Sequence, residues 1–481
     1  ISGNFKHPLF DGELNIDDPN VKLKFNGLVD VSKELNRFDF KADVEYAELN
    51  KLNLMKRDSI SIFAGKIDME MNGNDLNNTF GTIAFKETFY QSENDDFYFD
   101  DFKITSKKDE FKKTININSP DIMTGHIEGE FLIEDIPDLF INGVGSVYAN
   151  FKPKEITENQ YIDFDFEVYN KLIEVFVPDL QFGENTRLKG SVYSNESKMK
   201  FDFDSPEIVV LNNYLGKVKF KLDNFNPLYN AYVSIDTLDN GFYNLKGFNF
   251  INKTINDTLY ISTNFTGGKN KDVFNLSLYH TIDPEGNSVV GVKKSDITFN
   301  ENTWYLNEKN DKNNKIVFDN NFENVKFDSI VLNNNNEFIK FAGSTTDSTY
   351  KNLKVQFNDV DLGKLVPKVD SLDLKGNING DLNILQKKGV YFPSSNVTID
   401  NIDVNKTELG DMVIEIVGNN ELTRYNLNTT LTNNNVKSIN STGYIDSSTD
   451  NAQIQLNIEL DDFNLKAISP FGGSVITDIR G

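Results

Sequence analysis

Three histidines and several pairs of adjacent aspartates are the residues of this chain best suited to catalysis or metal binding. The histidines, His7, His126 and His280, lie far apart in the sequence, and no nucleophile–histidine–acid set is recognisable around them. The aspartate pairs are Asp17-Asp18, Asp95-Asp96, Asp100-Asp101 and Asp461-Asp462. Paired carboxylates serve glycoside hydrolysis or bind Ca²⁺, but these pairs lack the spacing of a calcium loop. A chain with 73 acidic residues also contains such pairs by chance. We therefore expect no enzyme activity, no catalytic residue, no metal site and no cofactor.

The charge and the absence of cysteine exclude further classes of protein. A net charge of −24 repels nucleic-acid phosphates and anionic membrane surfaces, so we expect neither as a ligand. With no cysteine, the chain has no disulfide, no thiolate metal site and no catalytic thiol. The single tryptophan, Trp304, could stack on a sugar or lie at a membrane interface, but a large strand residue is the simpler interpretation.

Alternation of apolar and polar residues is the dominant pattern of the sequence. The elements that it predicts must position any functional side chain. The alternation is clear in residues 38–44, 162–168, 217–222 and 453–460. Successive side chains of a β-strand point to opposite faces, so each segment has one apolar and one polar face. This pattern is typical of antiparallel sheet, because buried parallel strands are apolar throughout. Turn signals separate the segments, among them Asn26-Gly27, Asn72-Gly73 and Asn240-Gly241.

Four short segments depart from this alternation and indicate helical corners. They lie near 47–55, 133–139, 362–367 and 465–470, and the two that end at Pro367 and Pro470 resemble each other. We interpret them as parts of a degenerate repeat of strands, corner and glycine. No linker divides the chain, so we expect residues 1–481 to form one continuous repetitive segment, a fragment of a longer protein.

The apolar faces must be covered, because each large apolar side chain left in water forgoes about 1.5–3 kcal/mol. A second sheet, closure into a barrel, or lipid on the face of a curled sheet would each cover them. In the simplest alternative, the residues of these apolar faces form the core of an ordinary β-sandwich. The candidate lining residues are Phe38, Phe40, Val44, Ile162, Phe164, Phe166, Val218, Phe220, Leu222, Phe274, Leu276, Leu278, Ile454, Leu456 and Ile458.

A series of short motifs suggests how the faces are used. Residues 3–14 (GNFKHPLFDGEL) contain a glycine–proline–glycine strand motif, and residues 47–54 (AELNKLNL) form a leucine-rich corner. Residues 118–129 (NSPDIMTGHIEG) and the corners at Pro367 and Pro470 continue the series. The order of these motifs, spread over the whole chain, resembles that of the TamB family, the AsmA-like β-groove translocation and assembly module proteins, in its Bacteroidetes form.

The resemblance implies an all-β fold in which a long repetitive antiparallel sheet curls into an open, taco-like groove with a few short helical corners. It also implies a periplasmic protein of Gram-negative bacteria that reaches the outer membrane and is anchored in the inner membrane by a segment absent from this chain. The implied partners are phospholipid acyl chains and an outer-membrane assembly protein of the Omp85 class.

Three functions remain open at this point. The first is a periplasm-spanning hydrophobic conduit that transfers phospholipid between the inner and outer membranes and so supports outer-membrane biogenesis. The second is a scaffold or chaperone whose strand edges hold nascent outer-membrane β-barrel proteins by β-augmentation. The third is a multidomain β-sandwich adhesin, which predicts compact domains and exposed linkers.

Overall fold

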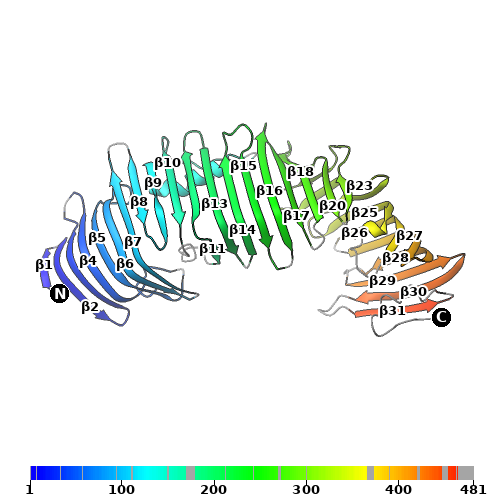
Figure 1. The fold of residues 1–481 in the computed structure, drawn as a ribbon, viewed down its shortest axis with the longest axis horizontal. Coiled ribbons are helices and arrows are strands. Elements are labelled where there is room, and N and C mark those ends of the chain that lie inside the picture. The colour runs from blue at the N-terminus through cyan, green and yellow to red at the C-terminus, as the bar shows by residue number, and fades with distance from the viewer. Residues whose placement is uncertain are drawn as a thin grey trace. The chain divides into compact units, whose positions relative to one another are not determined.

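The computed structural model describes residues 2–6, 8–32, 34–56, 58–93, 95–109, 112–148, 151–169, 179–211, 213–241, 243–268, 272–299, 301–365, 373–388, 390–419, 423–446, 453–461 and 463. Antiparallel strands make up nearly all of the regular structure in this part of the chain, so the prediction of an all-β, curled antiparallel sheet is confirmed (Figure 1). The chain divides into two compact units, Ile1–Lys253 and Thr254–Gly481.

In its described residues, the first unit is a series of hairpins with one helical insertion. Its elements are β1 (Ser2–Lys6), β2 (Leu9–Asp18), β3 (Val21–Asp30), β4 (Arg37–Glu48), β5 (Ser61–Asn72), β6 (Phe80–Ser92), β7 (Asp96–Lys108), β8 (Lys113–Asn118), β9 (Met123–Glu130), η1 (Ile133–Asp135), α1 (Ile136–Gly145), β10 (Tyr161–Val168), β11 (Leu180–Phe182), β12 (Thr186–Tyr193), β13 (Lys198–Val210), β14 (Asn213–Asp223), β15 (Ala231–Asp239) and β16 (Asn244–Ile255). Nearly every strand pairs with the strands before and after it in the sequence, and β11 pairs with β13 beside β12.

The second unit is also built of antiparallel strands, and at one place two pairs of short strands lie between β18 and β23. Its elements are β17 (Thr258–Gly267), β18 (Asp272–Ile282), β19 (Ser288–Val292), β20 (Ser295–Phe299), β21 (Asn302–Leu306), β22 (Lys315–Phe318), β23 (Asn324–Asn334), β24 (Glu337–Thr346), β25 (Tyr350–Asp361), α3 (Leu362–Leu365), β26 (Leu374–Lys387), β27 (Val390–Val404), β28 (Thr407–Gly418), β29 (Arg424–Asn433), β30 (Val436–Asp446) and β31 (Gln453–Leu460). Both β19 and β20 pair with β18, and their partners β22 and β21 both pair with β23.

β-Bulges shift the alternation in several strands. In β27, the pairing with β28 passes from Ile399 to Ile402, so two residues of β27 stand opposite one of β28. Asn401, within this bulge, has a φ of 54°. The extra residue keeps Ile399 and Ile402 on the same face, although strict alternation would place them on opposite faces. The strand β4 carries a similar bulge between Val44 and Ala47.

Asparagine has a structural role in the tight turns. Asn434 and Asn435, between β29 and β30, have φ values of 48° and 67°, as a two-residue hairpin turn requires. The prediction of a turn at Asn26-Gly27 is wrong, because both residues lie inside β3. Gly27 is needed there because β3 and β4 approach each other closely at this position. A Cβ atom at position 27 would lie 2.7 Å from Cβ of Phe40 on β4.

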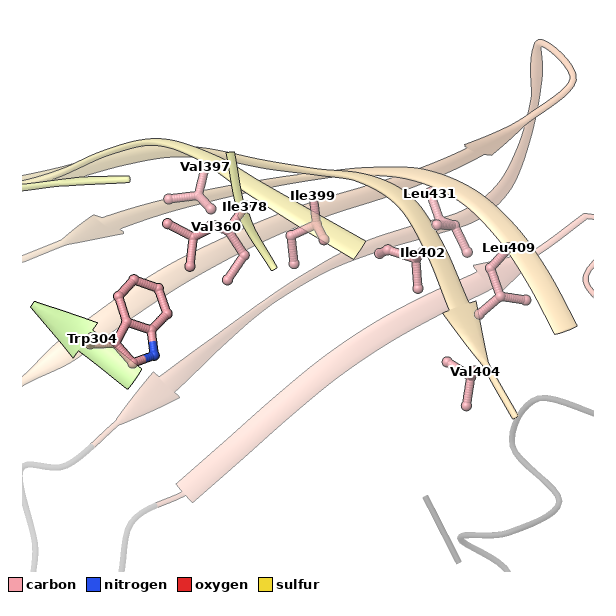
Figure 2. Packing of buried hydrophobic residues seen from close by; sticks show 9 residues of the cluster. All are labelled: Trp304, Val360, Ile378, Val397, Ile399, Ile402, Val404, Leu409 and Leu431. Carbon is pink, nitrogen blue, oxygen red and sulfur yellow. The ribbon is translucent and has the colours of Figure 1, made fainter. Parts of the chain in front are cut away.

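Two clusters of buried apolar side chains form the described core, one in each unit. The first unit's cluster contains Phe131, Leu139, Ile162, Phe164, Val192, Met199 and Leu222. The second unit's cluster contains Trp304, Val360, Ile378, Val397, Ile399, Ile402, Val404, Leu409 and Leu431, which lie along one side of the curved strands (Figure 2). Trp304 is 2% exposed, so it is a core residue of its sheet.

The predicted corners that the structure describes have different conformations. Residues 49–54 form turns between β4 and β5, and the hydroxyl of Tyr90 donates to Sδ of Met55 at 3.0 Å. Residues 133–139 lie in η1 and α1. Leu362–Leu365 form α3, whose Leu362 and Leu365 pack against the second unit's cluster, while residues 366 and 367 and the corner at 465–470 lie outside the described residues.

Candidate functional site

Strand register aligns apolar side chains into rows that cross the N-terminal strands of the first unit. One row runs from β2 to β7 through directly paired residues: Leu14, Phe25, Ala42, Ile67, Phe85 and Phe102. A second row contains Phe40, Met69 and Ile83. Aromatic rings touch between strands, since the centroids of Phe25 and Phe40 are 4.8 Å apart and those of Phe85 and Phe102 are 6.2 Å apart. We call this apolar side of β2–β7 the open face.

The open face lacks the cover that α1 gives to β12 and β13. Most of its large side chains, such as Phe25, Phe40 and Phe85, are only half-buried. In the described part of the chain, none of the β2–β7 side chains belongs to a buried apolar cluster, and the helices pack on β12, β13, β25 and β26. The side chains of the open face therefore shield each other sideways but leave their outer surfaces available to another molecule.

The candidate residues on β4 belong to the open face. Phe38 stands opposite Val29 and Met71, Phe40 opposite Met69, and Val44 is 7% exposed beside the bulge. Register thus brings these three residues together with the apolar residues of β2–β7.

The candidate residues on β10 and β14 lie on a covered part of the same sheet. Ile162, Phe164 and Leu222 are buried in the first unit's cluster, and Phe166 and Phe220 pack against it. Helix α1 provides the cover: its Leu139 is 1% exposed, and the ring of its Phe140 lies 5.5 Å from that of Phe164. Val218, on the same face of β14, is also buried.

The remaining candidates belong to the second unit and fall in two places. Phe274, Leu276 and Leu278 share one face of β18, where Phe274 stacks on Phe265 with ring centroids 4.6 Å apart. Ile454, Leu456 and Ile458 lie on β31 and are 64%, 47% and 55% exposed. β31 pairs with β30, and among the described residues it has no second neighbour.

The opposite face of the first unit is charged, and many of its side chains pair across strands. Nζ of Lys24 lies 2.5 Å from Glu45, and this hydrogen bond raises the pKa of the lysine and lowers that of the carboxyl. Lys219 and Asp204 form a similar pair at 3.4 Å. A hollow of about 530 Å³ on β2–β6 is lined by such charged residues and also by Leu14, Phe25, Ala42 and Ile67 of the apolar row. Because these pairs are exposed, they add little to stability and chiefly keep this face hydrated.

The residues considered first for chemistry are not assembled into a site. His126 lies in β9 and His280 in β18, whereas His7 lies outside the described residues. Burial lowers the pKa of His280. Within the described ranges, no group of three or more histidine, cysteine or acidic residues could hold a metal ion. None of the helices in those ranges is long and apolar enough to cross a membrane.

Comparisons with known proteins do not assign this chain to a family. No family model, no curated protein and no solved structure matches this chain. The likeness to the TamB family therefore stays a prediction from the motifs.

Sequence reasoning missed several residues of the open face. Phe85 and Phe102 complete its longest row, and Ile83 its second row, but none of them was a candidate. The sequence signal was weak because β6 contains an extra residue opposite Gly65, which interrupts the alternation. Helix α1 was expected only as a corner, and its position over Phe164 depends on contacts that the local sequence does not specify.

Proposed function

We propose that the open face binds lipid acyl chains and that this chain is a segment of a conduit for phospholipid between the inner and outer membranes. The observation that carries the proposal is the row Leu14, Phe25, Ala42, Ile67, Phe85 and Phe102, which crosses six strands without a covering layer in the described part of the chain. The two membranes and the periplasmic location are inferred from the motif resemblance.

The size of the open face fits a lipid tail. Strands lie about 4.8 Å apart, so six strands give a band about 24 Å long in the direction of the rows. Exposed apolar patches above a few hundred Å² are rare on soluble monomers and mark surfaces that meet a partner. An acyl chain lying along a row would bury apolar area at about 25 cal/mol per Å², with no need for a catalytic group.

Neighbouring positions on β2 provide a matched test. Leu14 faces the open face, whereas Asn15 faces the charged side opposite Lys24. Leu14→Asp and Asn15→Asp therefore introduce the same charge one residue apart on opposite faces. We expect Leu14→Asp to remove most co-purifying phospholipid, measured by lipid extraction and mass spectrometry, and Asn15→Asp to retain it.

Circular dichroism and unfolding curves must show that both variants are folded. If folded Leu14→Asp protein carries as much phospholipid as the wild type and Asn15→Asp, the proposal is wrong. Phe164→Asp, which the sequence alone would favour, is a poorer choice because Phe164 is buried under α1 and its substitution would disturb the core.

One observation supports the assembly scaffold as a second candidate. Residues Gln453–Leu460 of β31 are exposed along their whole length, and in the described part of the chain they pair only with β30. Such an edge offers backbone groups for β-augmentation. Photo-crosslinkers at Gln455 and Asn457 that capture barrel precursors, while crosslinkers at Phe25 capture no lipid, would favour the scaffold over the conduit.

A further inference from the structure

Two lysines face each other at one end of the open face. Lys108, the last residue of β7, pairs directly with Lys113, the first residue of β8. Alternation places Lys113 on the same side of β8 as Ile115 and Ile117. Like charges directly opposite each other on neighbouring strands are destabilising, and this chain is otherwise strongly acidic. The pairing therefore requires a physical reason.

Neither ammonium group has a carboxylate within ion-pair distance among the described residues. Nζ of Lys113 donates to the carbonyl oxygen of Leu76 at 2.5 Å, and Nζ of Lys108 donates to that of Asn77 at 3.4 Å. Lys113 is only 5% exposed. Burial, reinforced by the charge of Lys108, lowers the pKa of Lys113. The two carbonyl contacts use one N–H of each ammonium and leave the others for a ligand.

The lysines line a hollow of about 320 Å³ at the ends of β7–β9. Phe131 and Leu132 form part of its wall, and Nζ of Lys113 lies 6.0 Å from the centroid of the Phe131 ring. Phe131 also belongs to the buried cluster under α1. The hollow thus joins two cationic groups to apolar residues of the same face.

The other charges around the hollow limit what it could accept. Lys112 also lines it but is paired with Glu128 at 2.6 Å. The carboxylates of Asp109, Glu130 and Glu158 border the hollow, and the charges of Asp75 and Glu134 act on Lys113 from nearby. A small anion without an apolar part would meet these carboxylates with no compensating contact.

We propose that this hollow binds the phosphate group of a phospholipid headgroup, with Lys108 and Lys113 as its cationic donors. The phosphate oxygens accept hydrogen bonds from both ammonium groups and relieve the repulsion between them. The tail attached to the phosphate extends over the adjoining apolar residues, which a free phosphate ion lacks. This inference rests on the proposed function and adds a headgroup site to the acyl-chain surface.

The test uses the full chain and three ligands: a short-chain phosphatidylglycerol below its micelle concentration, the matching diacylglycerol without phosphate, and inorganic phosphate. The variants are Lys113→Met, Lys108→Met and, as a control, Lys103→Met. Lys103 is exposed on β7 and belongs to the opposite face. Lys108→Met is the safer variant, because Lys108 is exposed and Lys113 is buried.

We expect either lysine substitution to weaken phosphatidylglycerol binding on the order of tenfold. Diacylglycerol binding should be equal in all variants, and Lys103→Met should bind like the wild type. If folded Lys108→Met and Lys113→Met bind phosphatidylglycerol as the wild type does, the headgroup site is wrong while the acyl-chain surface stands. If inorganic phosphate binds as tightly as the lipid, the site is for a free ion and the lipid assignment is wrong. If neither lipid binds to the wild type, both this inference and the proposed function are wrong.

Discussion

Gly143 of α1 lies against Met199 of β13 so closely that a Cβ atom at position 143 would stand 2.7 Å from the Met199 sulfur. It would also lie 2.9 Å from Cβ of Met199, well inside van der Waals contact. The absence of a side chain at position 143 therefore allows α1 to cover Ile162 and Phe164 on the sheet.

A larger residue at position 143 should lift α1 from the sheet. We expect Gly143→Leu to lower the free energy of unfolding by about 1–3 kcal/mol, as overpacking does in other cores. Hydrogen exchange in residues 136–145 should become faster, because the helix loses its packing partner. Val144→Leu is the control, since Val144 is 47% exposed and should leave both quantities unchanged. Unchanged exchange in folded Gly143→Leu would contradict the close packing of α1 on β13.

The buried cluster of the first unit should be sensitive to loss of volume. Leu222 is 1% exposed on β14, and Leu228 is 80% exposed in the following turn. We expect Leu222→Ala to destabilise the protein by about 2–5 kcal/mol and Leu228→Ala by less than about 0.5 kcal/mol. Urea unfolding followed by circular dichroism measures both values. Equal effects of the two substitutions would mean that Leu222 is not in a packed core.

Acid should destabilise the second unit through His280. Burial lowers the pKa of His280, so the folded state holds the imidazole neutral at a pH where the unfolded chain, with a pKa near 6.5, binds a proton. The unfolded state then binds more protons, and the free energy of unfolding falls as the pH drops below about 6.5. The contribution of one proton is at most about 1.4 kcal/mol per pH unit. Unfolding curves at pH 7.5 and 5.5 should differ less for His280→Phe than for the wild type, and an identical difference would exclude this role of His280.

The second unit should tolerate both the loss of the extra residue in β27 and a change of residue type within the bulge. Deletion of Asn401 would leave one residue of β27 opposite Asp411 and so restore regular pairing with Ile399, Ile402 and Val404 still on the core face, and we expect the second unit to keep cooperative unfolding. Asn401→Gly keeps the bulge and suits its positive φ, so its stability should stay within about 1 kcal/mol of the wild type. A deletion variant that loses cooperative unfolding would contradict this prediction, because it would show that the second unit needs the bulge itself and not only the shared face of Ile399, Ile402 and Val404.

Simple alternation predicts the strands and their faces wherever the pairing is regular. Ile162, Phe164 and Phe166 share a face because β10 is regular along its whole length. The same reasoning fails at Ile402 and Val404, since one extra residue reverses the faces without a clear signal in the composition. Asn26-Gly27 shows another limit: the same dipeptide serves a hairpin turn or close strand packing, and only the neighbouring strand distinguishes the two.

The candidate site was only partly visible in the sequence for a related reason. Phe38 and Phe40 were recognised as strand residues of an apolar face, but the distinction between open and covered parts depends on α1, which reaches β12 and β13 from an insertion between β9 and β10. The pairing of Lys108 with Lys113 likewise depends on register across a hairpin. The first feature depends on the tertiary position of α1, and the second depends on the register of a hairpin, which the alternation pattern alone does not fix.

The pairing of strands with their neighbours in the chain also affects how each unit assembles. Almost every strand finds its partner within a few tens of residues, so little chain must be ordered before the next ladder forms. A newly emerging strand needs only the edge laid down immediately before it as a template. We expect such a chain to fold progressively along its length, and a longer version to need more time in proportion to its added strands.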